Sequence, residues 1–279
     1  MIMHRSGAKR KTGRERLCDL IANPRRRVKF YILSALFSVA ACAAPRPVSM
    51  PDPALVRANL LALADQEWRA FGGQVIYIEN GRERIDPVGA WEDERRGSPL
   101  VAKYWQAVGE DYTGYDCDKP WSAAFISWLM QAAGVPAEVF PRSGLHADYL
   151  RAEIAHSTQA NALFIPHDPA SYAPKPGDLI CASRAGTKII SYMDVPADAL
   201  LHCDLVVETA AGHLASIGGN VRNSVSKTIR PIGPDGKLAG AGTGDRPWFL
   251  ALALRAAPSP VAPGPIATRS LAAVETGAE

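Results

Sequence analysis

The hydrophobic pattern of this chain changes its period near residue 175, and this change strongly limits the folds it can adopt. Before that point, apolar residues recur at spacings of three and four, which is typical of amphipathic helices. After it, short apolar stretches alternate with polar residues between turn signals, which is typical of strands. Helices followed by strands predict the α+β class, with N-terminal helices packed on a small antiparallel sheet.

Four helices are expected in the first part of the chain. Ser98 is expected to be the N-cap of the second, with Pro99 at its first helical position. Asp118 is the candidate N-cap of the third helix, and Gly134 marks its end. The expected helices span residues 53–71, 98–109, 120–133 and 146–159.

Six strands are expected, one of them early in the chain and five after the change of period. They span residues 74–80, 175–184, 201–208, 213–219, 224–232 and 248–254. Cys181 and Cys203 fall in two of these strands, so a disulfide between them is one interpretation. Two separate buried cysteines fit the sequence at least as well.

The first 42 residues have the layout of a bacterial export signal. Ten basic residues within the first 29 positions precede an apolar stretch, residues 30–42, that is too short to span a bilayer. The stretch ends in small residues and Cys42 and resembles a lipobox, in which the cysteine becomes the lipidated first residue. We therefore expect a lipid-anchored cell-envelope protein that faces the periplasm, with residues 43–52 as a tether. An ordinary cleaved signal is the alternative.

Charge and composition limit the function further. The formal net charge of +3 comes from the basic N-terminal segment, and the remainder is mildly acidic, so no nucleic-acid-binding surface is expected. No cysteine and histidine spacing suggests zinc, and neither a metal nor a cofactor is expected. Residues 256–279 are rich in proline and alanine without periodicity and are expected to be disordered. One α+β domain is left, at residues 53–255.

Ser122 is the first residue of the candidate site. On a helix it shares one face with Phe125, Ile126 and Leu129, so it points inward. It also lies in the first helical turn, where free backbone N–H groups and the helix dipole favour negative charge. Both properties suit a nucleophile. Taken alone, the helix fits a small residue at a crowded helix–sheet contact better.

Two more polar residues belong to the candidate site. His202 begins a strand on which Asp204 faces the same way, and from there it can reach a helix packed across the sheet. Asn220 follows two glycines that let the backbone approach closely, and its carboxamide could hold an imidazole tautomer. A structural histidine and an ordinary turn asparagine are the respective alternatives.

Four motifs occur in an order that resembles a known superfamily. They read "PWSAAFISWLMQAAG", "PGDLI", "HCDLVV" and "IGGNVRNSVS". Together they resemble the papain-like CHAP/NlpC superfamily of peptidoglycan amidases and endopeptidases. Within it, the chain is similar to an uncharacterised bacterial family, domain of unknown function 2272. The resemblance covers about residues 95–255.

The resemblance implies a papain-like fold and hydrolysis of amide bonds in cell-wall peptides. It implies Ser122 as the nucleophile, His202 as the base and Asn220 as the residue that orients His202. Three further residues are expected to line the site: Trp121, His146 and Asp204. His146 and His213 are the alternatives to His202 as the catalytic histidine. The chain departs from the superfamily because serine replaces its cysteine. Serine is less acidic, so His202 would have to take its proton during the attack.

Two alternatives remain open. Cys117, five residues before Ser122, could supply the missing nucleophilic thiol if the backbone between them brought it to the site, but the spacing does not require this. The second alternative is a catalytically inactive envelope lipoprotein that keeps the fold as a ligand cleft. The replacement of the superfamily's cysteine by serine favours this alternative over an enzyme. His202 and Asn220 favour an enzyme, because a binding cleft needs neither a base nor a residue to orient it. Residues 184–201 are expected to cover the groove.

Overall fold

The computed structural model describes residues 49–184, 187–189, 191–240 and 246–256. The expected lipidation site Cys42, the export signal and nearly all of the expected C-terminal tail lie outside these residues. Within the described ranges, no helix combines the length and the apolar character needed to cross a membrane.

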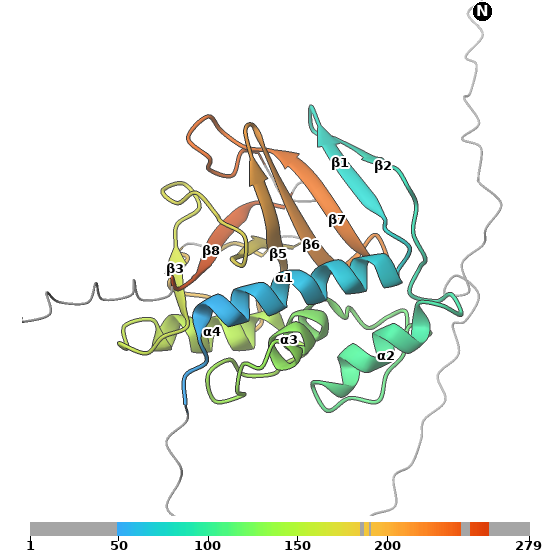
Figure 1. The fold of residues 1–279 in the computed structure, drawn as a ribbon, viewed down its shortest axis with the longest axis horizontal. Helices are drawn as coiled ribbons and strands as arrows, with labels where there is room; N and C mark the ends of the chain where they lie inside the picture. Colours follow the sequence, from blue (N-terminus) through green and yellow to red (C-terminus); the bar gives the residue numbers. More distant parts are fainter. Residues whose placement is uncertain (1–48, 185–186, 190, 241–245, 257–279) are drawn as a thin grey trace, which may run out of the picture.

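The described chain forms an eight-stranded sheet with helices α1, α3 and α4 packed against it, and helix α2 packs on α3 (Figure 1). The helices are α1 (Pro53–Ala70), α2 (Ser98–Gln106), α3 (Ser122–Ala132) and α4 (His146–His156). The strands are β1 (Val75–Glu79), β2 (Arg82–Ile85), β3 (Phe164–His167), β4 (Leu179–Ser183), β5 (Leu201–Ala210), β6 (His213–Val221), β7 (Ser224–Pro231) and β8 (Trp248–Leu254). Their order in the sheet is β2-β1-β7-β6-β5-β4-β8-β3.

The α+β class is confirmed, but the expected layout needs two corrections. The sheet is mixed, because β1 pairs in parallel with β7. The helices also do not all precede the strands, since β1 and β2 lie between α1 and α2. The pattern did not reveal β2 because its sequence, "RERI", is mostly charged. It did not reveal β3 because that strand contains Pro166, which an edge strand tolerates.

The predicted N-caps of the second and third helices, Ser98 and Asp118, are wrong. The N-cap of α2 is Gly97, and Ser98 is the first helical residue with no capping hydrogen bond. The N-cap of α3 is Trp121. Asp118 lies too early in the chain to reach the first free N–H groups of α3, and it forms an exposed ion pair with Lys119 at 2.9 Å.

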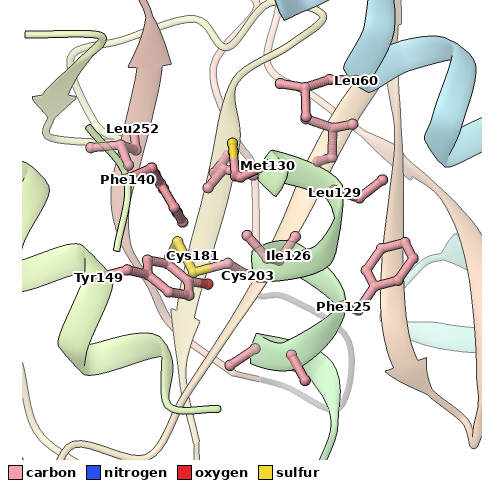
Figure 2. Packing of buried hydrophobic residues seen from close by; sticks show 14 of the residues in the cluster. Leu60, Phe125, Ile126, Leu129, Met130, Phe140, Tyr149, Cys181, Cys203 and Leu252 are labelled. Atoms are coloured by element: carbon pink, nitrogen blue, oxygen red, sulfur yellow. A yellow bond between two sulfur atoms is a disulfide. The ribbon is translucent and has the colours of Figure 1, made fainter. Parts of the chain in front are cut away.

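Helix α3 lies at the centre of the hydrophobic core. It packs against α1, α2, β5 and β6, and most of its side chains are buried. The inward face predicted from the sequence is confirmed, since Phe125, Ile126 and Leu129 are fully buried. Burial of each such side chain contributes roughly 1.5–3 kcal/mol. Figure 2 shows this core together with Cys181 and Cys203, which pair across β4 and β5 as a disulfide.

Two glycines of β6 allow α3 and Asp204 to lie close to the sheet. A Cβ atom on Gly219 would lie 2.5 Å from Cβ of Phe125 and 2.7 Å from the ring of Trp121. A Cβ atom on Gly218 would lie 1.8 Å from a carboxylate oxygen of Asp204. The close approach expected of these glycines is therefore confirmed, and it fixes the start of α3 against the sheet.

Substitution of Gly219 tests this close packing. We expect Gly219→Ala to lower the free energy of unfolding by about 1–3 kcal/mol, because the added methyl group overpacks the contact with α3. Urea unfolding measures the change. Gly233→Ala is the control, since its added carbon would meet chiefly the end of the exposed Asp235 side chain. Equal stability of the two variants would contradict the expectation.

A buried acid on α4 makes the stability depend on pH. Glu153 is 1% exposed, and its Oε1 atom has no hydrogen-bond partner among the described residues. Burial raises the pKa of Glu153 to about 8, although Arg142 opposes the shift. Between pH values of about 4.5 and 8, the unfolded chain has lost a proton that the folded chain keeps. The stability that the protonated Glu153 carboxyl group contributes is therefore complete at low pH, and it is lost as the pH rises through this window.

We expect the free energy of unfolding to fall by a few kcal/mol across that window, and Glu153→Gln to remove most of the slope. Urea unfolding at a series of pH values measures it. Asp148→Asn, on the exposed side of the same helix, is the control. A slope that persists unchanged in Glu153→Gln would assign the pH dependence to other groups.

Candidate active site

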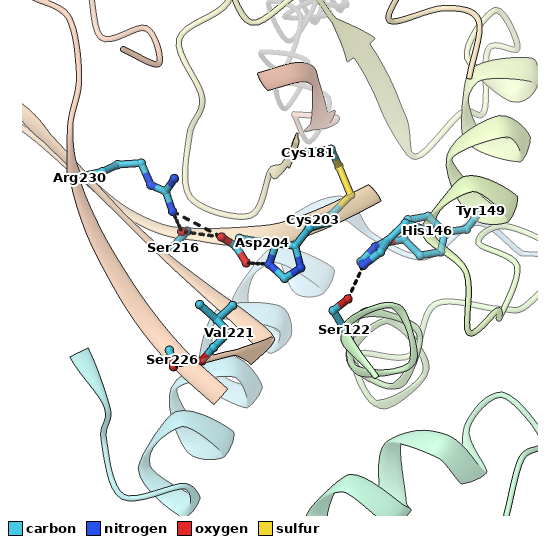
Figure 3. A network of polar contacts seen from close by, with 11 residues as sticks. Ser122, His146, Tyr149, Cys181, Cys203, Asp204, Ser216, Val221, Ser226 and Arg230 are labelled. Atoms are coloured by element: carbon cyan, nitrogen blue, oxygen red, sulfur yellow. Dashed lines mark hydrogen bonds and ion pairs between the residues drawn. A yellow bond between two sulfur atoms is a disulfide. The ribbon is translucent and has the colours of Figure 1, made fainter. Parts of the chain in front are cut away.

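The first residues of two helices meet at the candidate site. Ser122 begins α3 and His146 begins α4, and Ser122 Oγ lies 2.7 Å from His146 Nε2 (Figure 3). The other ring nitrogen, Nδ1, contacts the hydroxyl group of Tyr149, one turn further along α4. Ser122 is 3% exposed, and His146 and Tyr149 are also buried. The serine hydroxyl is thus held by an imidazole that is itself held in place.

The protonation of this imidazole follows from its surroundings. Burial lowers the pKa of His146 well below its usual value, and the nearby His202 and Arg184 lower it further. Burial also raises the pKa of Tyr149, so its hydroxyl stays protonated at neutral pH. His146 is therefore neutral. In the tautomer with the proton on Nδ1, which donates to Tyr149, Nε2 accepts from Ser122, as a general base must.

A second imidazole lies next to the first. His202 Nε2 lies 2.8 Å from Oδ1 of Asp204, and the ring centroids of His146 and His202 are 5.7 Å apart in an edge arrangement. The prediction that His202 and Asp204 face the same way along β5 is confirmed. The second oxygen of Asp204 accepts from Ser216 Oγ at 3.3 Å and lies 3.5 Å from the guanidinium of Arg230.

Asp204 stays ionised in this buried network. Burial by itself raises the pKa of Asp204, but His202 and Arg230 lower it by more, so it lies below its usual value. Charge-assisted hydrogen bonds of this kind are the stronger ones in proteins. Asp204, which the sequence placed only among the site-lining residues, therefore fixes the orientation of His202.

Asn220 lies against the start of α3. Its amide satisfies both neighbours when its oxygen accepts from the Trp121 backbone N–H at 3.2 Å and its nitrogen donates to Glu92 at 3.3 Å. Trp121 Nε1 also donates to Glu92, at 2.6 Å. Asn220 and Trp121 thus hold the backbone that precedes Ser122. The resemblance implied that Asn220 orients His202. In the structure, Asp204 is the residue that contacts His202.

A groove opens beside the Ser122–His146 pair. Its volume is about 480 Å³, and Ser122 and His146 form part of its wall. Apolar and aromatic side chains line much of the remainder: Trp105, Val108, Tyr112, Pro120, Leu145 and Leu200. Residues 199–201, at the end of the segment expected to cover the groove, form one of its walls. The groove therefore has room for a ligand next to the serine.

Sequence reasoning placed His146 among the lining residues and as an alternative catalytic histidine, but it paired Ser122 with His202. The motif "SGLHADYL" does put His146 at a helix start, as Ser122 is, and Tyr149 follows at the i+3 position on the same face. That these two helix starts meet depends on tertiary packing. The contributions of Ser216 and Arg230 were also missed, because each lies on a separate strand, β6 or β7.

The fold and the site define an α+β protein with a serine–imidazole pair and a second, carboxylate-bound imidazole beside a groove. The chain belongs to the family described as "Uncharacterized protein conserved in bacteria (DUF2272)", whose model matches residues 90–254. No curated protein and no solved structure matches the chain. The predicted family is therefore confirmed, and the wider CHAP/NlpC relationship remains a prediction.

Proposed function

We propose that this protein is a lipid-anchored cell-envelope hydrolase with a papain-like fold of the CHAP/NlpC type. Its proposed substrates are amide bonds in peptidoglycan peptides. The observation that best supports this proposal is the 2.7 Å contact between Ser122 Oγ and His146 Nε2 at the wall of an open groove. The order of the four sequence motifs supports it independently.

The proposed reaction begins with attack of Ser122 Oγ on the amide carbonyl carbon. The serine proton passes to His146 Nε2, and the free N–H groups at the start of α3 stabilise the oxyanion. His146 then gives this proton to the amide nitrogen as the carbon–nitrogen bond breaks and the amine leaves. Water cleaves the resulting ester, with His146 again taking and returning one proton.

The second imidazole has a supporting role in this scheme. A proton on His146 is unfavourable in its buried position, and the negative charge of Asp204 opposes that effect by raising the pKa of His146. Asp204 also holds His202 at the edge of the His146 ring. We therefore assign Asp204 as the residue that stabilises the protonated intermediate of His146, and His202 as a positioning residue whose ring packs against that of His146.

Digestion of purified peptidoglycan tests the proposal. The full-length protein is expected to release soluble peptides, detected by chromatography. Ser122→Ala and His146→Ala are expected to lose about a thousandfold or more of the rate. His202→Ala, which removes a positioning residue, is also expected to lose rate. Ser157→Ala, at the opposite end of α4, is the matched control. The same product pattern from wild type and Ser122→Ala would refute the hydrolase proposal.

A non-catalytic binding cleft is the second candidate function. Two observations favour it: serine replaces the cysteine of the superfamily, and burial makes His146 a weak proton acceptor. A binding protein would sediment with peptidoglycan and leave it uncleaved. It would also bind equally well after Ser122→Ala, because no covalent step would take place.

A further inference from the structure

Three arginines line a second cavity close to the candidate site. This cavity has a volume of about 400 Å³, which lies in the range typical of small-molecule sites. The side chains Arg184, Arg222 and Arg246, called here the arginine pocket, come from three separate parts of the chain. Asn220 and Trp91 are among the other described residues that line it.

Among the described residues that line the arginine pocket, positive charge is in excess. Arg222 pairs with Glu83 through an Nε–Oε2 contact of 2.8 Å. Burial lowers the pKa of Arg246, and the charges of Arg184 and Arg222 lower it further, whereas Asp204 and Glu83 oppose the shift. Asp204 is already engaged with His202 and Arg230. An anion in the pocket would therefore relieve repulsion between partly desolvated cations.

The backbone around the pocket is held in an uncommon conformation. Asn220, Arg222 and Asn223 have φ angles of 56°, 54° and 60°, in the left-handed region. For a long side chain such as arginine, this conformation costs about 1–2 kcal/mol. Arg222 and Asn223 are the central residues of the two-residue hairpin turn closed by Val221 and Ser224, a geometry that requires positive φ at both positions. Here the turn between β6 and β7 places Arg222 at the wall of the pocket.

The arginine pocket and the groove at Ser122 are neighbours. Arg184 lines both cavities. Asn220 lines the pocket and accepts a hydrogen bond from the backbone of Trp121, the residue before Ser122. A ligand that lies across Ser122 could therefore reach the groove with one part and the pocket with the other.

We propose that the arginine pocket binds a carboxylate group and selects acidic peptides as ligands of the site. Guanidinium groups bind carboxylates through two parallel hydrogen bonds, which adds geometric specificity to charge. Carboxylate binding follows from the pocket alone. The further step, that the bound peptide is cleaved at Ser122, rests on the proposed function.

Calorimetric titration of the full-length Ser122→Ala variant tests the binding step without hydrolysis. The probes are glutarate and glutaramide, which share a carbon skeleton but differ in charge. We expect glutarate to bind in the millimolar range and glutaramide not to bind. Arg184→Gln and Arg246→Gln are each expected to weaken glutarate binding about tenfold or more. Arg69→Gln is the control, because Arg69 is exposed and pairs with Asp65 on α1.

Further arms of the titration separate the alternatives. Arg184→Lys keeps the charge but loses the planar donor pair, so an intermediate affinity is expected. Thermal unfolding shows whether each variant is folded. Equal binding of glutarate and glutaramide would overturn the proposal, as would binding of inorganic phosphate without glutarate. Absence of peptidoglycan cleavage would affect only the proposed function, because glutarate binding does not depend on Ser122.

Discussion

Replacement of Asp204 by alanine is expected to lower the free energy of unfolding by about 3–5 kcal/mol. The carboxylate is buried and contacts three buried side chains, His202, Ser216 and Arg230. Arg230 depends on it most, since its Nε and Nη1 atoms have no hydrogen-bond partners within the described residues. Removal of Asp204 would leave a buried guanidinium without its anion, which is the costly way to break an ion pair.

Urea unfolding of matched variants measures this effect. Glu208→Ala, on the same strand but exposed, is the control and is expected to change stability by no more than about 0.5 kcal/mol. Asp204→Asn keeps the shape and loses the charge, so an intermediate loss is expected. The folded state lowers the pKa of Asp204, so its contribution is present above the unfolded pKa and is lost as the pH falls through the folded value. Similar losses in Asp204→Ala and Glu208→Ala would show that the network does not stabilise the fold.

The parts of the fold that were predictable depend on local periodicity. The inward face of α3 followed from the spacing of Phe125, Ile126 and Leu129, because helical geometry alone puts these residues on one side. The common face of His202 and Asp204 followed in the same way from strand alternation. The strands β2 and β3 escaped prediction because an edge strand can be charged or contain proline, and then has no clear hydrophobic pattern.

The site was predictable in its residues but not in its pairings. Ser122, His146, His202 and Asp204 were all recognised as candidates, yet the serine was paired with His202. Which imidazole reaches Ser122 depends on how the tertiary fold brings the start of α4 to the start of α3, and local sequence does not encode that contact. Asn220 illustrates the same limit. Its place after two glycines was informative about close approach, but not about which neighbour its amide would bind.

Substitution of Ser122 by cysteine is expected to create a reactive thiolate. The thiol would occupy the first position of α3, where the helix dipole favours negative charge, and would lie next to His146. We expect alkylation by iodoacetamide at neutral pH to be at least about tenfold faster than for an ordinary cysteine. Mass spectrometry of the peptide that contains residue 122 measures this rate separately from the other cysteines. Amidase activity on peptidoglycan is expected to rise in the same variant, since a thiolate needs no proton transfer during its attack.

The imidazole that activates the thiol can be identified by combining Ser122→Cys with His146→Gln or with His202→Gln. The structure places His146 against the reacting atom, so the first combination is expected to return the alkylation rate to that of an ordinary cysteine. The second combination is expected to have the smaller effect, because His202 acts through His146 in the proposed scheme. The reverse result would assign the thiolate partner to His202, as the sequence motifs predict. A rate insensitive to both substitutions would leave only the start of α3 as the source of activation, and would argue against a serine–imidazole pair that performs catalysis.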